Sequence, residues 1–201
     1  MQAVVLRKLA LCTEKQKRAI RRIRNQPSVH KSMYTDHEIT QQEHEAWLQR
    51  IQDDPKQIVF LVFVDDELAG TVSISALDRL HRKADWAFYL DETRRGGLGA
   101  ALEFALIDHV FGDLQLEKLN CEVLETNPAV VKMHGRFGFE KEGYRRSNII
   151  KDGKRIGVFF LGLTKADWSS RRAEVEESSR SVFERFSVSI ENERRGSSTK
   201  S

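Results

Sequence analysis

The chain has 201 residues, of which 40% are hydrophobic and 31% are charged, and its formal net charge is +3. Length and composition favour one soluble globular domain with a short appendage. Because the net charge is small and no run of like charge forms a basic arm, the sequence does not indicate a nucleic-acid partner.

The two cysteines and the N-terminal segment restrict the setting of the protein. Cys12 and Cys121 are far apart and belong to no CxxC motif, so neither a disulfide framework nor a metal site is expected. The first twenty residues lack the apolar stretch and cleavage site of a secretory signal, and no apolar run is long enough to span a membrane. We therefore expect a cytoplasmic protein without a membrane partner.

The first quarter of the chain combines one strand pattern with two helix patterns. The segment 3–11 is typical of a strand, and Thr13 with Gln16 forms a capping box that predicts a helix to about Arg24. A polar loop follows, and a second capping box at 40–43 predicts another helix. The chain is therefore expected to place two helices before its next strand.

The middle of the chain is rich in strand patterns. Strands are expected at 58–64, 71–75, 84–90 and 118–125. One helix follows the glycines after residue 95, another begins at Asn127, and Asp152-Gly153 favours a type I′ turn in a last hairpin. This order predicts a mixed α/β fold, neither a sandwich nor a doubly wound series.

Beyond Trp168 the composition shifts to Ser, Arg and Glu. We therefore expect a domain over 1–168 and a charged tail over 169–201. This tail is predicted to be partly helical and to end in a disordered segment. It could support a homodimer or have no role in assembly.

The stretch "RRGGLGA", residues 94–100, lies between a predicted strand and a predicted helix. A turn there leaves backbone N–H groups unpaired at the positive end of a helix dipole, and glycines let a phosphate approach closely. Either a pyrophosphate cradle or a purely structural turn fits this pattern. A dinucleotide fingerprint fails because Leu102 stands at its third glycine, and a P-loop fails because Ala100-Ala101 replaces its Lys-Ser/Thr pair.

Together with the helix that begins at Asn127, this glycine stretch makes the sequence resemble the GNAT superfamily of N-acetyltransferases, over about residues 4–165. Arg94, Gly97 and Gly99 match its Arg/Gln-x-x-Gly-x-Gly/Ala motif, and Asn127 matches the Asn that begins its next motif helix. "Gly-Phe" at 138–139 closes that second motif. The resemblance implies a mixed, mostly antiparallel sheet flanked by helices, with acetyl-CoA as cosubstrate. The cofactor-binding residues that it implies are Leu90, Asp91, Arg94, Arg95, Gly96, Gly97, Leu98, Gly99, Ala100 and Asn127.

A narrower resemblance concerns the loop before the second helix. "RNQPSVHKSMYTDHEITQQEHEAWL" is similar to the substrate loop of amino-sugar N-acetyltransferases of pseudaminic acid biosynthesis, and "CEVLETN" is similar to their strand with an inward glutamate. This implies transfer to the 4-amino group of a UDP-linked 4-amino-4,6-dideoxy sugar. The residues expected to bind this nucleotide sugar are Arg24, Met33, Tyr34, His44 and Tyr89. The alternatives are a surface ion pair for Arg24, an exposed helix position for His44, and plain packing for the others.

Two residues are candidates for proton transfer in a direct attack of the amine on the thioester. Glu122 is expected to accept the amine proton, with Asp85 and Glu125 as weaker competitors; the alternative is an ion pair on a strand. His134 occupies the position where the superfamily usually places a tyrosine acid. An imidazole, with an unperturbed pKa of about 6.5, can supply a proton near neutral pH. The alternative is that His134 only packs and that water protonates the thiolate.

Two other functions stay open on the sequence alone. One keeps the chemistry and changes the acceptor to a protein N-terminus, as in acetyltransferases that act on ribosomal proteins. The other is a regulatory module that binds acyl-CoA and has lost catalysis together with the tyrosine.

Overall fold

The computed structural model describes residues 1–94 and 96–193 of the 201-residue chain. Its strands are β1 (Gln2–Lys8), β2 (Ile58–Val64), β3 (Glu67–Asp78), β4 (Lys83–Leu90), β5 (Lys118–Leu124), β6 (Glu140–Lys151), β7 (Lys154–Thr164) and β8 (Phe186–Glu191). Its α-helices are α1 (Glu14–Arg24), α2 (Pro27–His30), α3 (Gln41–Gln52), α4 (Leu98–Gly112), α5 (Pro128–Arg136), α6 (Lys165–Ser178) and α7 (Arg180–Phe183). A short 3₁₀ helix, η1 (Leu9–Leu11), follows β1.

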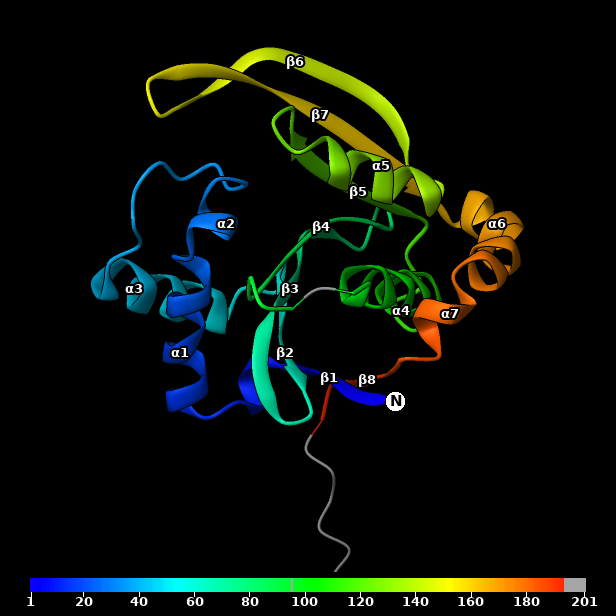
Figure 1. The fold of residues 1–201 in the computed structure, drawn as a ribbon, viewed down its shortest axis with the longest axis horizontal. Coiled ribbons are helices and arrows are strands. Elements are labelled where there is room, and N and C mark those ends of the chain that lie inside the picture. The colour runs from blue at the N-terminus through cyan, green and yellow to red at the C-terminus, as the bar shows by residue number, and fades with distance from the viewer. Residues whose placement is uncertain (95, 194–201) are drawn as a thin grey trace, which may run out of the picture.

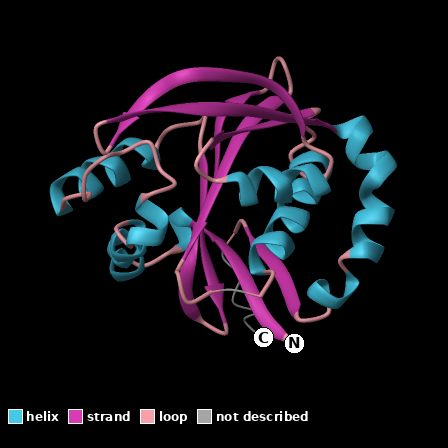
Figure 2. Ribbon diagram, turned by 45° about the horizontal axis from the view of Figure 1, so that its top comes forward, coloured by secondary structure: helices cyan, strands magenta, loops and turns pink. Residues whose placement is uncertain are grey.

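The strands form one eight-stranded sheet in the order β6-β7-β5-β4-β3-β2-β1-β8. Only β4–β5 and β1–β8 pair in parallel, so the sheet is mixed and mostly antiparallel, as the sequence predicts. Helices α1, α2 and α3 lie on one side of the sheet, and α4, α6 and α7 lie on the other (Figures 1 and 2). This arrangement confirms the expected α/β fold.

The local rules that predict the first helices are confirmed. Thr13 and Gln16 make both hydrogen bonds of a capping box at α1, and Thr40 does the same with Glu43 at α3. The apolar run of β2 is buried on both faces of the sheet. Alternate residues of this strand contribute to two separate cores, one beneath α1 and α3 and one beneath α4.

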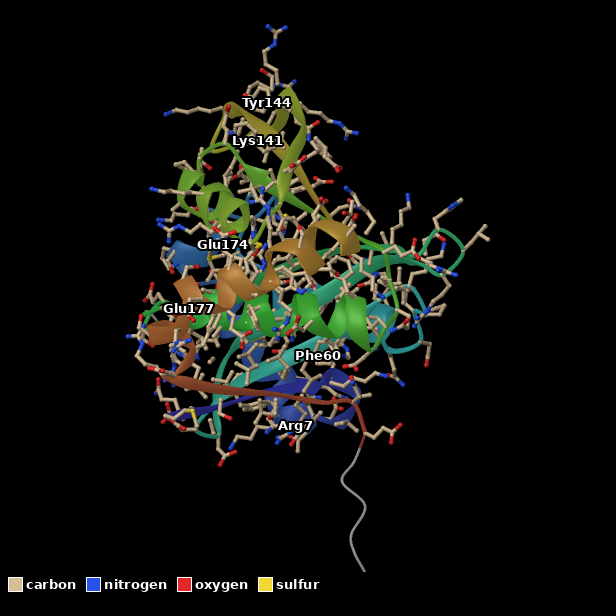
Figure 3. The ribbon with its side chains drawn as sticks, turned by 90° about the vertical axis from the view of Figure 1, so that its right-hand side faces the viewer. Arg7, Phe60, Lys141, Tyr144, Glu174 and Glu177 are labelled. Atoms are coloured by element: carbon tan, nitrogen blue, oxygen red, sulfur yellow. The ribbon has the colours of Figure 1, made fainter. Side chains whose placement is uncertain are left out.

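The hairpin of β6 and β7 extends across the top of the molecule in Figure 1. Asp152 and Gly153 both have positive φ, 49° and 70°, which is the backbone of the expected type I′ turn. Figure 3 shows Lys141 and Tyr144 of this hairpin at the opposite end of the molecule from Arg7 of β1. The hairpin therefore continues the sheet beyond β5, over the end that carries the loop 31–36.

Strands β4 and β5 are paired over only three registers, Lys83–Asp85 with Lys118–Asn120. Beyond Asp85, β4 keeps its partner β3 up to Leu90, and β5 keeps its partner β7 up to Leu124. The two central strands therefore diverge, and the edge of β4 from Trp86 onward faces no strand.

The segment after Thr164 returns to the sheet. The boundary predicted at Trp168 falls inside α6, and residues 169–191 continue through α7 into β8, which pairs with β1. Arg7 and Glu191 join these two strands with an ion pair of 2.7 Å. The stretch predicted to be disordered, "GSSTKS", lies outside the described residues.

Candidate active site

The glycine turn links the end of β4 to the start of α4. Gly96 and Gly97 have φ values of +79° and +96°, a conformation that favours glycine, and Gly97 is the N-cap of α4. Because no side chain caps this helix, its first N–H groups remain available to an anion. A Cβ on Gly99 would lie 3.3 Å from the Phe88 ring. The backbone here fits a cradle for the pyrophosphate of a CoA-type cosubstrate.

Two other predicted cofactor residues hold the turn itself. The carboxylate of Asp91 accepts hydrogen bonds from Thr93 and from the side chain of Gln26. The Arg94 guanidinium donates to Glu67 at 2.6 Å. These contacts fix the loop before α4. Arg95 lies outside the described residues.

The divergence of β4 from β5 leaves backbone groups without a strand partner. The amide of Asp91 donates to the carbonyl of Ala69 on β3, at 2.7 Å. Since N–H groups alternate along an antiparallel strand, the amide of Leu90 faces the gap instead. Leu90, rather than Asp91, is therefore the residue of this pair that can offer an amide to a cosubstrate in the gap.

The far side of the glycine turn is covered by the C-terminal segment. A Cβ on Gly97 would lie 2.6 Å from a Val182 methyl group, so α7 rests directly on the turn. The Arg185 guanidinium donates to the carbonyl oxygen of Gly96. The first residues of α4 are thus enclosed by a part of the chain about 85 residues away.

On the other face of the sheet, the loop 31–36 reaches β5. The Tyr34 hydroxyl donates a hydrogen bond to the exposed carboxylate of Glu122, and the pKa of this phenol is raised by its burial and by that bond. Asn127, at the start of α5, contacts Ser32 of the same loop at 3.4 Å. The structure therefore brings together a predicted substrate residue, the predicted base and a predicted cofactor residue.

Arg24 lies next to this loop and is half-buried. One of its terminal nitrogens, Nη2, donates to Thr35 Oγ1 at 2.9 Å. The other, Nη1, is sealed from solvent and has no hydrogen-bond partner. Burial lowers the pKa of Arg24, and the nearby Tyr89 opposes that shift. The guanidinium is thus held beside Tyr89 with an unused donor.

Two residues predicted to bind substrate lie in packing positions. His44 is only 5% exposed, and its Nε2 lies 2.8 Å from the carbonyl oxygen of Lys17, so it joins α3 to α1. Met33 packs against the core beneath α1 and α3. The described contacts of both residues are structural.

His134 lies in α5, one residue after Met133, whose sulfur lies 3.8 Å from the Cβ position of Gly99. The imidazole is 3% exposed, and its Nδ1 lies 2.7 Å from Oε1 of Glu103 on α4. Trp86 packs against the ring in an edge-on arrangement at 5.3 Å. His134 is therefore a buried residue with a carboxylate partner, at the end of α5 that approaches the glycine turn.

Sequence reasoning missed three of the residues that build this site. Thr35 orients Arg24, Ser32 contacts Asn127, and Glu103 binds His134. Thr35 and Ser32 lie in a polar loop and carry no distinctive pattern. Glu103 had a usable signal, since it is a carboxylate inside the apolar stretch "LGAALEFALI".

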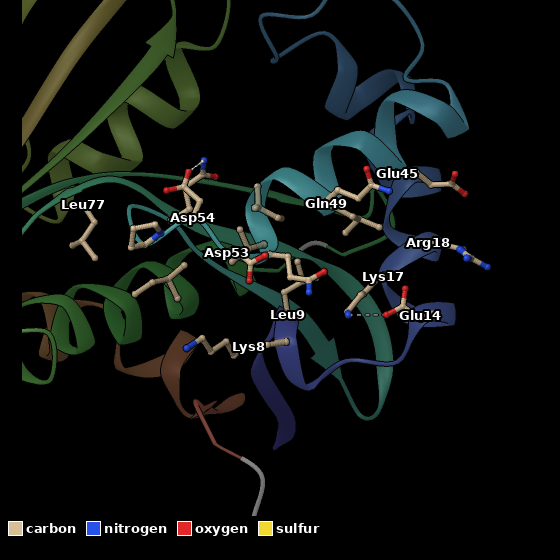
Figure 4. A pocket seen from close by; sticks show the side chains of 18 of the residues that line it. Lys8, Leu9, Glu14, Lys17, Arg18, Glu45, Gln49, Asp53, Asp54 and Leu77 are labelled. Carbon is tan, nitrogen blue, oxygen red and sulfur yellow. Dashed lines mark hydrogen bonds and ion pairs between the residues drawn. The ribbon is translucent and has the colours of Figure 1, made fainter.

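A pocket of about 600 Å³ lies elsewhere, between η1, α1 and the end of α3 (Figure 4). Acidic and basic side chains are mixed along it, and none of the residues predicted for cofactor, acceptor or catalysis lines it. No group of three His, Cys, Asp or Glu side chains in the described ranges is arranged to hold a metal ion. None of the described helices is both long and apolar enough to cross a membrane.

A divided central sheet and a glycine turn at the N-terminus of a helix are the features of an acyl-CoA-dependent N-acyltransferase. The model of the acetyltransferase (GNAT) domain family matches residues 9–158. The chain belongs to this family and is an acetyl-CoA-dependent N-acetyltransferase.

Similar proteins differ in their acceptors. The L-amino acid N-acetyltransferase AaaT of Escherichia coli is 23% identical over 73% of this chain and 91% of its own length. The ribosomal-protein-serine acetyltransferase of the same organism is 33% identical, over 42% of this chain and 48% of its own length. The spermidine N-acetyltransferase of Vibrio cholerae, solved with CoA and spermine, has a TM-score of 0.75 at 21% identity, over 83% of this chain and 98% of that structure. These three names do not support the expected nucleotide-sugar acceptor.

Proposed function

We propose that the protein transfers the acetyl group of acetyl-CoA to a primary amine of an acceptor that also carries an anionic group. Attack is direct, with both substrates bound together in the gap between β4 and β5. The observation that carries the acceptor class is the unused donor of Arg24, a cation held half-buried with no carboxylate partner in the described structure.

The proton transfers are assigned to two residues. As the amine nitrogen bonds to the acetyl carbon, Glu122 accepts a proton from the amine, and the carbon–sulfur bond breaks. The departing sulfur takes a proton from His134. The Leu90 amide, which faces the gap, is the candidate donor to the carbonyl oxygen, where negative charge develops. The exposure of Glu122 and its bond from Tyr34 support the first role, because Tyr34 belongs to the loop that would cover an acceptor.

Arg24 and Glu122 are linked through neighbouring residues of the loop, since Thr35 binds Arg24 and Tyr34 binds Glu122. An acceptor whose amine is close to Glu122 would thus contact the loop that also binds Arg24. A carboxylate or phosphate there would gain a charge-assisted hydrogen bond. A polyamine would place a second cation there instead, which costs free energy in a partly buried site.

Two acceptor types meet this requirement. An α-amino acid carries its carboxylate beside its amine, and AaaT is by name an L-amino acid acetyltransferase. A UDP-linked amino sugar, the acceptor expected from the sequence of the loop 24–48, carries a diphosphate; the names of the similar proteins do not support it, and it is tested beside the amino acid. A peptide N-terminus, suggested by the ribosomal-protein enzyme, lacks a fixed anionic group and is the second candidate.

The acceptor class is tested by following thiol release from acetyl-CoA with amino acids, UDP-4-amino sugars, short peptides and spermidine. We expect turnover with one of the anionic classes. Arg24→Leu should raise the KM for that acceptor about 10-fold or more, because a charge-assisted hydrogen bond contributes about 1.5–3 kcal/mol. The KM for acetyl-CoA should not change, and Arg18→Leu, an exposed arginine on the same helix, should leave both constants unchanged.

The thermal stability of Arg24→Leu provides a separate check. Since the substitution removes a half-buried charge that has one hydrogen bond, to Thr35, and no described carboxylate partner, the variant should be about as stable as the wild type. Preference for spermidine over every anionic acceptor would contradict the proposed acceptor class. Absence of turnover with all amines, with normal CoA binding, would favour the non-catalytic module.

A further inference from the structure

Glu103 is an unusual residue for its place in the fold. It lies in the middle of α4, between apolar neighbours, and its exposed fraction is 0%. Burial raises the pKa of its carboxyl, and the hydrogen bond to His134 opposes that rise. Moving a carboxylate from water into a protein interior is costly even with one good partner, and such pairs contribute little to stability. Packing alone therefore does not explain a glutamate here.

The carboxylate of Glu103 and the imidazole of His134 are hydrogen-bond partners of each other. Oε1 of Glu103 lies 2.7 Å from Nδ1 of His134, while Oε2 is sealed from solvent without a partner. Trp86 and Phe139 both pack against the imidazole, each with its ring centre 5.3 Å away. These two aromatic rings enclose the imidazole on the sides that they cover.

Other titratable groups near the pair do not compete for His134. Cys121 on β5 has its thiol pKa raised, chiefly by burial and further by Glu103 and Asp85, so it remains a neutral thiol. Asp85 on β4 accepts its hydrogen bond from Asn120. Among the described residues that pack around the ring, Glu103 is thus its one charged partner.

We infer that Glu103 is a positioning residue for the proposed acid, His134; this rests on the proposed function. A carboxylate at Nδ1 selects the tautomer with its proton on Nδ1 and leaves Nε2 as the nitrogen that exchanges a proton with the reacting sulfur. The carboxylate also stabilises the doubly protonated ring before transfer. The pairing explains why a histidine can stand where a phenol is usual, since a phenol has one proton site and needs no tautomer partner.

The new nitrogen–carbon bond forms, the carbon–sulfur bond breaks, and the thiolate takes the Nε2 proton of the imidazolium. His134 then remains neutral with Nδ1–H donating to Glu103, and it regains a proton from solvent. The amine proton leaves separately through Glu122, and it balances the proton that His134 regains, so a neutral amine reacts with no net release of protons.

The test compares Glu103→Gln, His134→Tyr, His134→Phe and the double variant Glu103→Gln/His134→Tyr. Glu103→Gln should lower kcat by about 10- to 100-fold, the loss that follows when the carboxylate partner of a metal-binding histidine is removed. The KM values and CoA affinity should stay unchanged. The pH at which kcat is half-maximal should shift, because the ring loses its counter-charge. In the His134→Tyr background the same substitution should change kcat less than twofold.

A matched control is available on the same helix. His109 is also buried and pairs with a carboxylate, Asp113, at 2.7 Å between Nδ1 and Oδ2. Asp113→Asn should leave kcat and its pH profile unchanged. Equal effects of Asp113→Asn and Glu103→Gln on kcat would overturn the inference, because they would point to a general effect on the fold.

Three further outcomes separate the inference from the proposed function. If His134→Phe abolishes activity while Glu103→Gln keeps kcat and its pH profile, His134 is the acid and the positioning role of Glu103 is overturned. If His134→Phe is close to wild type, both assignments fall. In case Glu103→Gln does not fold, ¹⁵N NMR of the wild-type imidazole still decides: the Nδ1–H tautomer supports the inference, and the Nε2–H tautomer overturns it.

Discussion

Three of the six histidines are buried, and each has a different hydrogen-bond partner. His44 is bound to a backbone carbonyl, His109 to an exposed carboxylate, and His134 to a carboxylate that is itself buried. Only the last arrangement places two ionisable groups together out of water beside the cofactor turn. Burial alone is therefore common to all three histidines, and the buried carboxylate partner sets His134 apart from the other two.

Gly97 offers a direct test of the glycine turn. Gly97→Ala places a side chain at φ +96° and within 2.6 Å of Val182, so it should lower the free energy of unfolding by about 1–2 kcal/mol. CoA affinity should fall with it. Chemical denaturation and calorimetric titration measure the two effects.

The control for this substitution is Gly112, at the other end of α4. A Cβ there would meet nothing within 4 Å, so Gly112→Ala should leave stability unchanged or raise it by about 0.5 kcal/mol. Equal behaviour of the two variants would show that the strain assigned to Gly97 is absent.

At the scale of elements, the capping box of α3 predicts a dependence on pH. The backbone N–H of Thr40, with its hydroxyl and His37, lowers the pKa of Glu43 to about 2. Since the folded pKa lies below the unfolded value of about 4.3, the charged form stabilises the fold above that value. This stabilisation is lost as the pH falls from about 4.3 toward about 2.

Melting temperatures of the wild type and Glu43→Gln should therefore differ at pH 7 and converge as the pH falls through this window. Glu45→Gln is the matched control. Glu45 lies one turn after Gln41 on the same helix, and its described partner is the neutral side-chain amide of Gln41. If the difference in melting temperature between wild type and Glu43→Gln stayed constant down to pH 2, the charge of Glu43 would not be its cause.

Elements with local determinants could be predicted from the sequence. The capping boxes at Thr13 and Thr40, the buried strand β2 and the turn at Asp152-Gly153 each depend on residues adjacent in the chain. The glycine turn was predictable for the same reason. Strand β8 was not, because its pairing with β1 depends on contacts across almost the whole chain.

The same distinction applies to the site. Tyr34 and Glu122 were each identified from motifs, but their contact joins residues 88 positions apart. The partner of His134 and the interior position of His44 depend on how helices pack, which a single sequence does not specify. Pattern therefore predicted the residue types of the site, and tertiary packing decided which of them meet.

At the scale of the whole molecule, the segment α6–α7–β8 extends the family domain. The family model ends at residue 158, yet Val182 and Arg185 contact the glycine turn and Phe186 is buried in the main core. The segment is thus part of the structure that supports the glycine turn, not a separate appendage.

Removal of β8 should therefore have two effects. A chain that ends at Glu184 loses Phe186, which should lower the free energy of unfolding by about 3 kcal/mol, and it exposes the edge of β1 to self-association. CoA affinity should fall as the glycine turn loses Arg185. Size-exclusion chromatography, denaturation and titration measure these three changes.

A point substitution separates the causes. Arg185→Ala in the full chain should weaken CoA binding with little self-association, because β8 remains in place. Normal CoA affinity in both variants would show that the C-terminal segment supports the sheet alone.

The parallel pairing of β1 with β8 also determines how the molecule responds to a stretching force. Gln2 pairs with Phe186 and Arg7 with Glu191. The N-terminal side of the chain therefore lies at one end of this strand pair, and the C-terminal side lies at the other. Tension applied between the N-terminal and C-terminal sides acts along the strands and loads their hydrogen bonds, together with the Arg7–Glu191 ion pair, at the same time. Strands β1 and β8 thus form a shear clamp, whose hydrogen bonds must break before the described fold between them can extend.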